Sequence, residues 1–305
     1  MTGGMSGKKQ PHIICITKNG TNPAYEGARV GARRIAEREG ARLTSSWPEK
    51  PDDPEEQEML LRHPLLQQPD AIMIAPAHPT RLDPALSAVR ETGVPIVSFV
   101  SRSASLAPDC FVTSDNRALA EGIAKHLFGA INWRGNIAII EGNPASETSN
   151  PRTRGFLAAI AQAKDISLVA QEIGFYQRDS AVQAMTGILE KRRDLDGVLV
   201  ANDFMALGVI EVLKKASLDI PVVSVNAMPQ AIEAMRQGDL LATSAFDAMK
   251  IACVATMATL RLLEGKPVPA EIMLPVEIVT EANCSAWSRD YEDRPLPVWE
   301  DIVGS

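Results

Sequence analysis

The feature that most constrains this chain is a regular alternation of short apolar runs with amphipathic stretches, repeated from residue 12 to beyond residue 240. The runs expected to form strands are His12–Thr17, Ala71–Ala75, Pro95–Val100, Asn136–Ile140, Gly197–Ala201, Pro221–Val225 and Leu240–Phe246. The helical stretches expected beside them cover residues 54–68, 83–92, 116–129, 152–164, 180–192, 204–216 and 229–237, and an apolar helix covers 248–264. Strands that are apolar throughout and alternate with helices are typical of parallel sheets covered by helices on both faces.

The first helix is predicted from its ends. Asn22-Pro23 has the residues of a helix N-cap followed by proline at the first helical position, and Gly40 is a typical stop. Between them, Ala28, Ala32, Ile35 and Ala36 share one side of a helix.

Two lobes are expected rather than one sheet. The length of 305 residues corresponds to about two domains, and open sheets with very many strands tend to split. A break is predicted near 112–116, where a strand pattern gives way to a helix capped by Asp115. The segment after Cys284 has weak periodicity and several prolines, so it is expected to lie along the surface.

Charge and hydropathy exclude some classes of function. The chain has 31 Lys and Arg against 38 Asp and Glu, a net charge of −7, which disfavours a nucleic-acid partner. No run of about 18 apolar residues occurs, so no insertion into a membrane is expected.

The compartment stays open at this point. Residues 1–11 are small, polar and basic, without the apolar region of a secretion signal. They are either a native cytoplasmic start or a leader in place of a signal. Cys15 and Cys253 are expected to be buried thiols. Cys110 and Cys284 are expected in loops, where pairing in an oxidising compartment remains an alternative.

No catalytic or metal-binding motif was found. The nucleophile elbow, the P-loop, the zinc-protease helix and the dinucleotide fingerprint are all absent from the sequence. The chain is therefore not expected to be an enzyme, and no cofactor or metal is expected.

Polar side chains that are not nucleophiles follow the ends of the predicted strands. Ligands bind at the carboxyl ends of parallel strands in open α/β sheets, and amide and guanidinium groups there suit hydroxyls and carboxylates. The candidates in this position include Lys18, Asn22, Ser101, Arg102, Arg152, Asn202 and Asn226.

These segments resemble the type I periplasmic binding proteins, especially the ribose-binding and related sugar-binding members, over about residues 11–282. The resemblance is carried by Asn22-Pro23-Ala24-Tyr25, Val94–Val97 leading to Arg102, Ser114-Asp115-Asn116, Arg152-Thr153-Arg154-Gly155-Phe156, Ala201–Gly208 and Gly238–Thr243.

The resemblance implies two Rossmann-like α/β lobes joined by three hinge crossings, near 113–116, 244–248 and 275–278. The implied first lobe is 11–114 plus 247–276, the second is 115–246 plus 277–290, and 291–305 is a C-terminal tail. A ligand that touches both lobes would favour the closed form. Asn22, Arg102, Arg152, Asn202 and Asn226 would bind hydroxyls, and Tyr25 and Tyr176 would stack on a sugar ring.

Departures from the ribose-binding pattern concern the ligand's charge. Lys18 stands at a small hydroxyl position, Ser101 at an aspartate position, Asn226 at another aspartate position and Phe246 at a glutamine position. The loss of two acceptors and the gain of a cation predict that Lys18, Arg102 and Arg152 converge on one cleft and favour an anionic ligand such as a sugar acid. A Lys18 that extends to solvent is the alternative.

The resemblance implies the solute-binding component of an ABC importer for a sugar or sugar-derived molecule, located in the periplasm and recognised by a membrane permease. The alternative is the effector-binding core of a Lac-repressor-like or receptor-coupled regulatory protein without a DNA-binding domain of its own, because only eleven residues precede the first strand.

Overall fold

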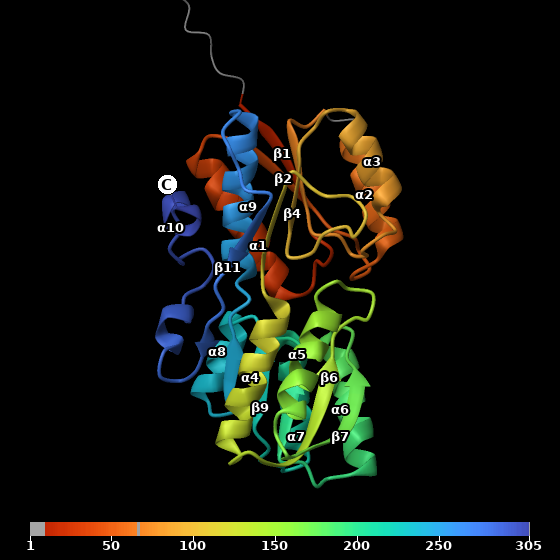
Figure 1. Ribbon diagram of the computed structural model, residues 1–305, viewed down its shortest axis with the longest axis vertical. Coiled ribbons are helices and arrows are strands. Elements are labelled where there is room, and N and C mark those ends of the chain that lie inside the picture. Colours follow the sequence, from red (N-terminus) through yellow and green to blue (C-terminus); the bar gives the residue numbers. More distant parts are fainter. Residues whose placement is uncertain (1–9, 66–67, 305) are drawn as a thin grey trace, which may run out of the picture.

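The computed structural model describes residues 10–65 and 68–304. They form two α/β lobes, one above the other in Figure 1, each built on a six-stranded sheet. The expected fold class is confirmed, because both sheets are mostly parallel and are covered by helices.

All neighbouring strands of the first sheet are parallel. In spatial order they are β11 (Glu271–Leu274), β5 (Cys110–Ser114), β4 (Ile96–Phe99), β3 (Ala71–Ile74), β1 (His12–Ile16) and β2 (Arg42–Ser46). The second sheet is parallel except at β12, which pairs antiparallel with β10. Its order is β12 (Ile278–Val279), β10 (Ala242–Ser244), β9 (Val222–Val225), β8 (Gly197–Val200), β6 (Arg134–Glu141) and β7 (Asp165–Ile173).

Helices from distant parts of the sequence cover the first sheet. They are α1 (Pro23–Arg38), α2 (Pro54–Leu65), α3 (Asp83–Glu91) and α9 (Ala248–Leu263). The second sheet is covered by α4 (Asn116–Ala130), α5 (Ser149–Ala161), α6 (Arg178–Lys191), α7 (Asp203–Lys215) and α8 (Pro229–Arg236). The C-terminal segment adds a 3-10 turn, η1 (Cys284–Trp287), and α10 (Trp299–Val303).

The strands at the centre of the first sheet are buried on both faces, as their continuous apolar sequences predict. Ile14 of β1 belongs to a cluster that packs under α2 and α3, whereas Ile13 and Cys15 belong to the larger core that includes α1 and α9. Helix α9 is buried on nearly every side from Ala248 to Thr259, because it packs between α1 and the sheet, and this explains its almost uniformly apolar sequence.

The chain passes between the two sheets three times. It leaves the first sheet after β5 at Asp115, returns after β10 through residues 245–247, and leaves again after β11 through residues 275–277. That the residue ranges given above move as two separate lobes remains a prediction.

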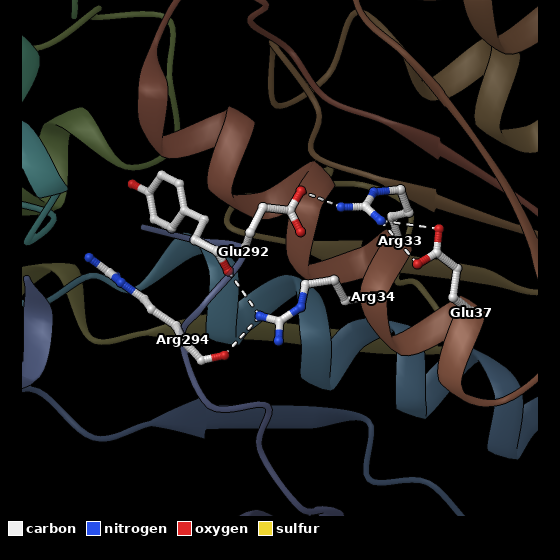
Figure 2. A network of polar contacts seen from close by, with 6 residues as sticks. Arg33, Arg34, Glu37, Glu292 and Arg294 are labelled. Carbon is white, nitrogen blue, oxygen red and sulfur yellow. Dashed lines mark hydrogen bonds and ion pairs between the residues drawn. The ribbon is translucent and has the colours of Figure 1, made fainter. Parts of the chain in front are cut away.

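A fourth connection is made by residues 284–303, which we call the strap. In Figure 1 this segment runs along one side of both lobes to the C-terminus. Figure 2 shows Arg34 of α1 between two strap carbonyls, with Nη1 at 2.9 Å from the oxygen of Tyr291 and 2.8 Å from that of Arg294. Arg33 pairs with Glu292 of the strap and with Glu37.

The strap also reaches the second lobe. The Arg294 side chain is 6% exposed, and its Nη2 donates to the carbonyl oxygens of Trp287 at 2.8 Å and Ala227 at 3.3 Å. The strap packs closely on α1 at Gly27, where a Cβ would lie 2.6 Å from the Tyr291 ring.

Several expectations need correction. Cys110 lies in β5 and Cys284 in η1, not in loops, and both are buried free thiols. Burial raises the pKa of Cys110 to about 12, which makes it unreactive. Residues 66–67, near the end of the helix predicted over 54–68, lie outside the described residues. Residues 1–9, which make up most of the polar N-terminal segment, also lie outside them.

Within the described ranges, the longest apolar helices are too short or too polar to cross a bilayer.

Candidate functional site

A cavity of about 30 Å³ lies between the two lobes, and both contribute to its walls. Seven of the ten predicted site residues line it: Asn22, Tyr25, Arg152, Tyr176, Asn202, Asn226 and Phe246. The first lobe supplies Asn22 and Tyr25, the second supplies the next four, and Phe246 lies on the second crossing between the sheets.

Parallel strands bring these residues together, because each wall lies at the carboxyl ends of its sheet. Asn22 follows β1, and Asn202 and Asn226 follow β8 and β9. Asn22 and Asn202 are helix N-caps whose Oδ1 atoms accept hydrogen bonds from Ala24 N at 3.0 Å and Met205 N at 2.9 Å. No described residue accepts from their side-chain amide groups, which are therefore available to a ligand.

Asn226 supplies an acceptor. Its side chain is buried, its Oδ1 has no partner among the described residues, and it lines the cavity. A buried acceptor without a hydrogen bond is costly. Its backbone has φ 136°, a value that asparagine rarely adopts. The strained turn thus holds an unsatisfied acceptor against the cavity, where a ligand hydroxyl would complete it.

The turn at Asn226 is stabilised by hydrogen bonds to Asp203. This buried carboxylate accepts hydrogen bonds from the hydroxyls of Ser224 and Thr243 and from the backbone N–H of Met228. Burial raises the pKa of Asp203, while these three donors and the charge of Arg152 act in the opposite direction.

Arg152 supplies the one charged side chain in the described cavity lining. Its Nε donates to Asn116 Oδ1 at 2.8 Å and its Nη1 to the carbonyl oxygen of Ala201 at 2.6 Å. The guanidinium lies over the rings of Phe246 and Tyr176, with its central carbon 4.9 and 5.7 Å from the ring centres. These contacts orient the guanidinium and leave Nη2 without a partner among the described residues.

Tyr176 is held by its backbone and by one hydroxyl. It has φ 61°, a left-handed value that is uncommon for tyrosine. Its OH lies 3.0 Å from Thr148 Oγ1, and the ring packs so close to Gly142 that a Cβ there would be 2.2 Å away. The ring therefore has a defined place in the cavity wall.

The predicted convergence of three cations is not what the structure shows. Arg102 lies outside the cavity, stacks on Phe111 and pairs with Glu271 at 2.9 Å. Lys18 is 2% exposed, so it does not extend to solvent, but it does not line the cavity either. Its Nζ donates to Ser101 Oγ at 3.3 Å, so Ser101 also lies at Lys18 and not at the cavity.

Four lining residues were missed: Ala24, Val100, Thr148 and Ala248. Three of them are apolar and carry no recognisable chemistry. Thr148 lies in the non-periodic segment 142–150, where the sequence does not show which hydroxyl turns inward. The pattern Ser146-x-Thr148 ahead of the α5 arginine was the one available indication.

The lining contains hydrogen-bonding groups and aromatic rings, with no thiol, imidazole or carboxylate among the described residues. No cluster of His, Cys, Asp and Glu that could hold a metal occurs in residues 10–65 and 68–304. The cavity volume of about 30 Å³ suffices for one or two water molecules, so a larger ligand can enter only if lining side chains or the walls move.

Comparison with known proteins agrees with this architecture. Residues 13–267 match the family described as "Periplasmic binding protein domain". The ribose import binding protein of Bacillus subtilis is 26% identical over 278 residues, which cover 90% of each chain. The D-ribose/D-allose-binding protein of Pseudomonas aeruginosa is 26% identical over 287 residues, 89% of each chain.

A solved structure is similar over the same range. An ABC transporter periplasmic solute binding protein from Actinobacillus succinogenes, with bound D-allose, has a TM-score of 0.86 and 27% identity, and the match covers 90% of this chain and 99% of that one. With the family match spanning most of the sequence and both lobes reproduced, the chain belongs to the periplasmic binding protein family.

Proposed function

We propose that this chain is the solute-binding component of an ABC importer, and that it closes its two lobes on a sugar or a sugar-derived small molecule. The observation that carries the proposal is the composition of the interlobe cavity. Two asparagine amides, one guanidinium and an unpaired asparagine oxygen line it, and two tyrosines and a phenylalanine complete the walls. Such a set matches the alternating hydroxyls and C–H faces of a sugar.

The relatives support the substrate class. The curated relatives described above are named for binding ribose and allose, and the similar structure holds D-allose. Location in the periplasm and recognition of the closed form by a membrane permease follow from the same proposal. The relatives described above are binding proteins, which supports binding rather than catalysis.

Any preference of the cavity for an anionic ligand depends on Arg152, because Lys18 and Arg102 do not line the cavity. Arg152 is 3% exposed and has no carboxylate partner among the described residues, so its guanidinium would favour a carboxylate on the ligand. A neutral sugar hydroxyl would use the same free Nη2.

The test is a thermal-shift screen of pentoses, hexoses, polyols and sugar acids, followed by calorimetry on those that raise the midpoint of unfolding. We expect stabilisation by members of this panel and turnover of none. Failure of the whole panel to bind would refute the proposal. Tight binding of neutral sugars only would refute the anionic preference.

A matched pair of arginine variants tests the site itself. Arg152 and Arg102 both stack on a phenylalanine ring, at 4.9 and 4.6 Å, but only Arg152 lines the cavity. We expect Arg152→Met to weaken ligand binding about 100-fold and Arg102→Met to change it less than about threefold. Circular dichroism and thermal unfolding confirm folding of both variants. Equal effects of the two substitutions would place the ligand elsewhere.

A further inference from the structure

Lys18 joins the two lobes directly. It follows β1 in the first lobe, and its Nζ donates to Ser146 Oγ of the second lobe at 2.9 Å as well as to Ser101 Oγ of its own lobe. Ser101 in turn donates to the carbonyl oxygen of Pro76 at 2.9 Å, which holds its oxygen toward Lys18. A lysine that is 2% exposed therefore spans the interface between the lobes.

The segment 143–148 makes a second bond across the same interface. Glu147 Oε2 accepts a hydrogen bond from the backbone N–H of Arg102 at 2.7 Å. We call this group the clasp: the side chains of Lys18, Ser101, Ser146 and Glu147 and the backbone N–H of Arg102, whose own side chain pairs elsewhere with Glu271.

The electrostatics of Lys18 depend on both lobes. Burial lowers the pKa of Lys18, the carboxyls of Asp52 and Glu147 act to raise it, and Arg152 lowers it. An ammonium group out of water requires hydrogen bonds and opposite charge. Ser146 and Glu147 provide part of both, and they belong to the opposite lobe. Separation of the lobes would remove these groups and expose Nζ to water.

A chain of hydroxyls connects the clasp to the cavity. Ser146 Oγ lies 3.0 Å from Thr148 Oγ1, which lies 3.0 Å from the OH of Tyr176. Thr148 and Tyr176 line the cavity, whereas Lys18 and Ser146 do not. The position of the Tyr176 hydroxyl is thus tied to the bond that Lys18 makes across the interface.

We propose that Lys18 is a positioning residue that holds the lobes closed through Ser146 and orients Tyr176 through Thr148, without contacting the ligand. This inference rests on the proposed function for its ligand measurements only. The proposal explains why Lys18 is buried but does not line the cavity: its Nζ donates to Ser101 Oγ of the first lobe and to Ser146 Oγ of the second.

The test compares Lys18→Met, Ser146→Ala and the double variant. Dissociation and association rates are measured by stopped-flow tryptophan fluorescence with a ligand from the screen. We expect each single variant to raise the dissociation rate about tenfold, equivalent to about 1.4 kcal/mol, with an association rate within about threefold of wild type. The double variant should resemble the single ones, because both remove the same bond.

Ligand charge separates this role from direct contact. If Lys18 acts only through the clasp, its loss weakens the binding of neutral and anionic ligands by the same factor. A loss confined to anionic ligands in Lys18→Met, with Ser146→Ala unchanged, would show that Lys18 binds the ligand and would overturn the proposal. Additive effects in the double variant would also overturn it.

A distance measurement tests the clasp without relying on ligand identity. Spin labels at Glu91→Cys of the first lobe and Lys191→Cys of the second report the separation of the lobes, and the native cysteines are buried. We expect Ser146→Ala and Lys18→Met to shift the distribution to longer distances. A distribution that is unchanged both without and with ligand rejects the clasp. Failure of every ligand to bind wild type rejects the proposed function instead.

Discussion

Apart from the three crossings, the clasp and the strap join the lobes within the described residues, and the two are built differently. The clasp joins them through side chains in loops. Lys18 Nζ donates a hydrogen bond to Ser146 Oγ, and Glu147 Oε2 accepts one from the backbone N–H of Arg102. The strap joins them through a continuous segment, in which Arg294 bonds to the Ala227 carbonyl of one lobe and accepts from Arg34 of the other.

The difference lies in what separation of the lobes would break. In the clasp, each broken bond frees groups on loops that water can reach and solvate. In the strap, the buried Arg294 guanidinium donates to three carbonyls, those of Ala227, Trp287 and Arg289, and stacks on two aromatic rings. We therefore expect the lobes to part at the clasp and to stay joined at the strap.

The largest effect is expected at the strap. Arg294→Ala removes a buried guanidinium that donates to three carbonyl groups, and it leaves the buried acceptor of Ala227 without this partner, which should lower the free energy of unfolding by about 3 kcal/mol. Urea unfolding measures the loss, and hydrogen exchange should show deprotection of residues 284–303. A loss below about 1 kcal/mol with protection unchanged would show that the strap does not hold the lobes.

A smaller effect, dependent on pH, is expected at the clasp. Burial raises the pKa of Glu147 above 4.5, Glu271 adds to the rise, and the backbone N–H of Arg102 and the charges of Lys18 and Arg102 oppose it. The folded protein then binds this proton more tightly than the unfolded chain does. The stabilisation from Glu147 is therefore complete below the unfolded pKa and is lost as pH rises through the folded one.

Glu147→Gln removes the titration and keeps an oxygen for the Arg102 N–H. We expect the variant to gain stability relative to wild type as pH rises from 4.5 toward neutral, measured by urea unfolding at several pH values. Parallel stability curves for the two proteins would contradict the assignment of a buried, titrating carboxyl to the clasp.

The smallest effect is expected at the rim of the strap. Arg33 pairs with Glu292 and Glu37 in Figure 2, but its side chain and theirs are exposed. Exposed ion pairs contribute little because water and salt screen them. Arg33→Ala should change the free energy of unfolding by about 0.5 kcal/mol or less, which makes it the matched control for Arg294→Ala. A loss comparable to that of Arg294→Ala would mean that surface charge, not burial, seats the strap.

Most of the fold was predictable because the central strands are buried on both faces. Runs such as Ala71–Ile74 and Gly197–Val200 are apolar at every position, and the structure forms strands there. The missed strands lie toward the sheet edges. β2 has the sequence RLTSS and is half-buried after its first residue, and β7 has the sequence DISLVAQEI and is half-buried or exposed at all but one position. Edge strands need apolar residues on fewer faces, so their sequences resemble loops.

The placement of site residues was predictable where a strand end determined it. Asn202 and Asn226 lie within two residues of the ends of β8 and β9, Asn22 caps α1 at the end of the loop that follows β1, and all three line the cavity. Lys18 also follows β1, but its long side chain reaches a hydroxyl of the other lobe. Where the end of a flexible side chain lies depends on the partners that the second lobe offers, and no local pattern contains that information.

Gly27 shows how far such dependence extends along the chain. Glycine inside a helix costs about 1 kcal/mol relative to alanine, yet at this position even a methyl group would collide with the Tyr291 ring. An alanine here would favour the isolated helix and oppose the seated strap. The sign of the change in the free energy of unfolding caused by Gly27→Ala would thus report whether the strap is seated on α1. A single methyl group in the first helix can therefore probe the packing of residues more than 250 positions later in the chain.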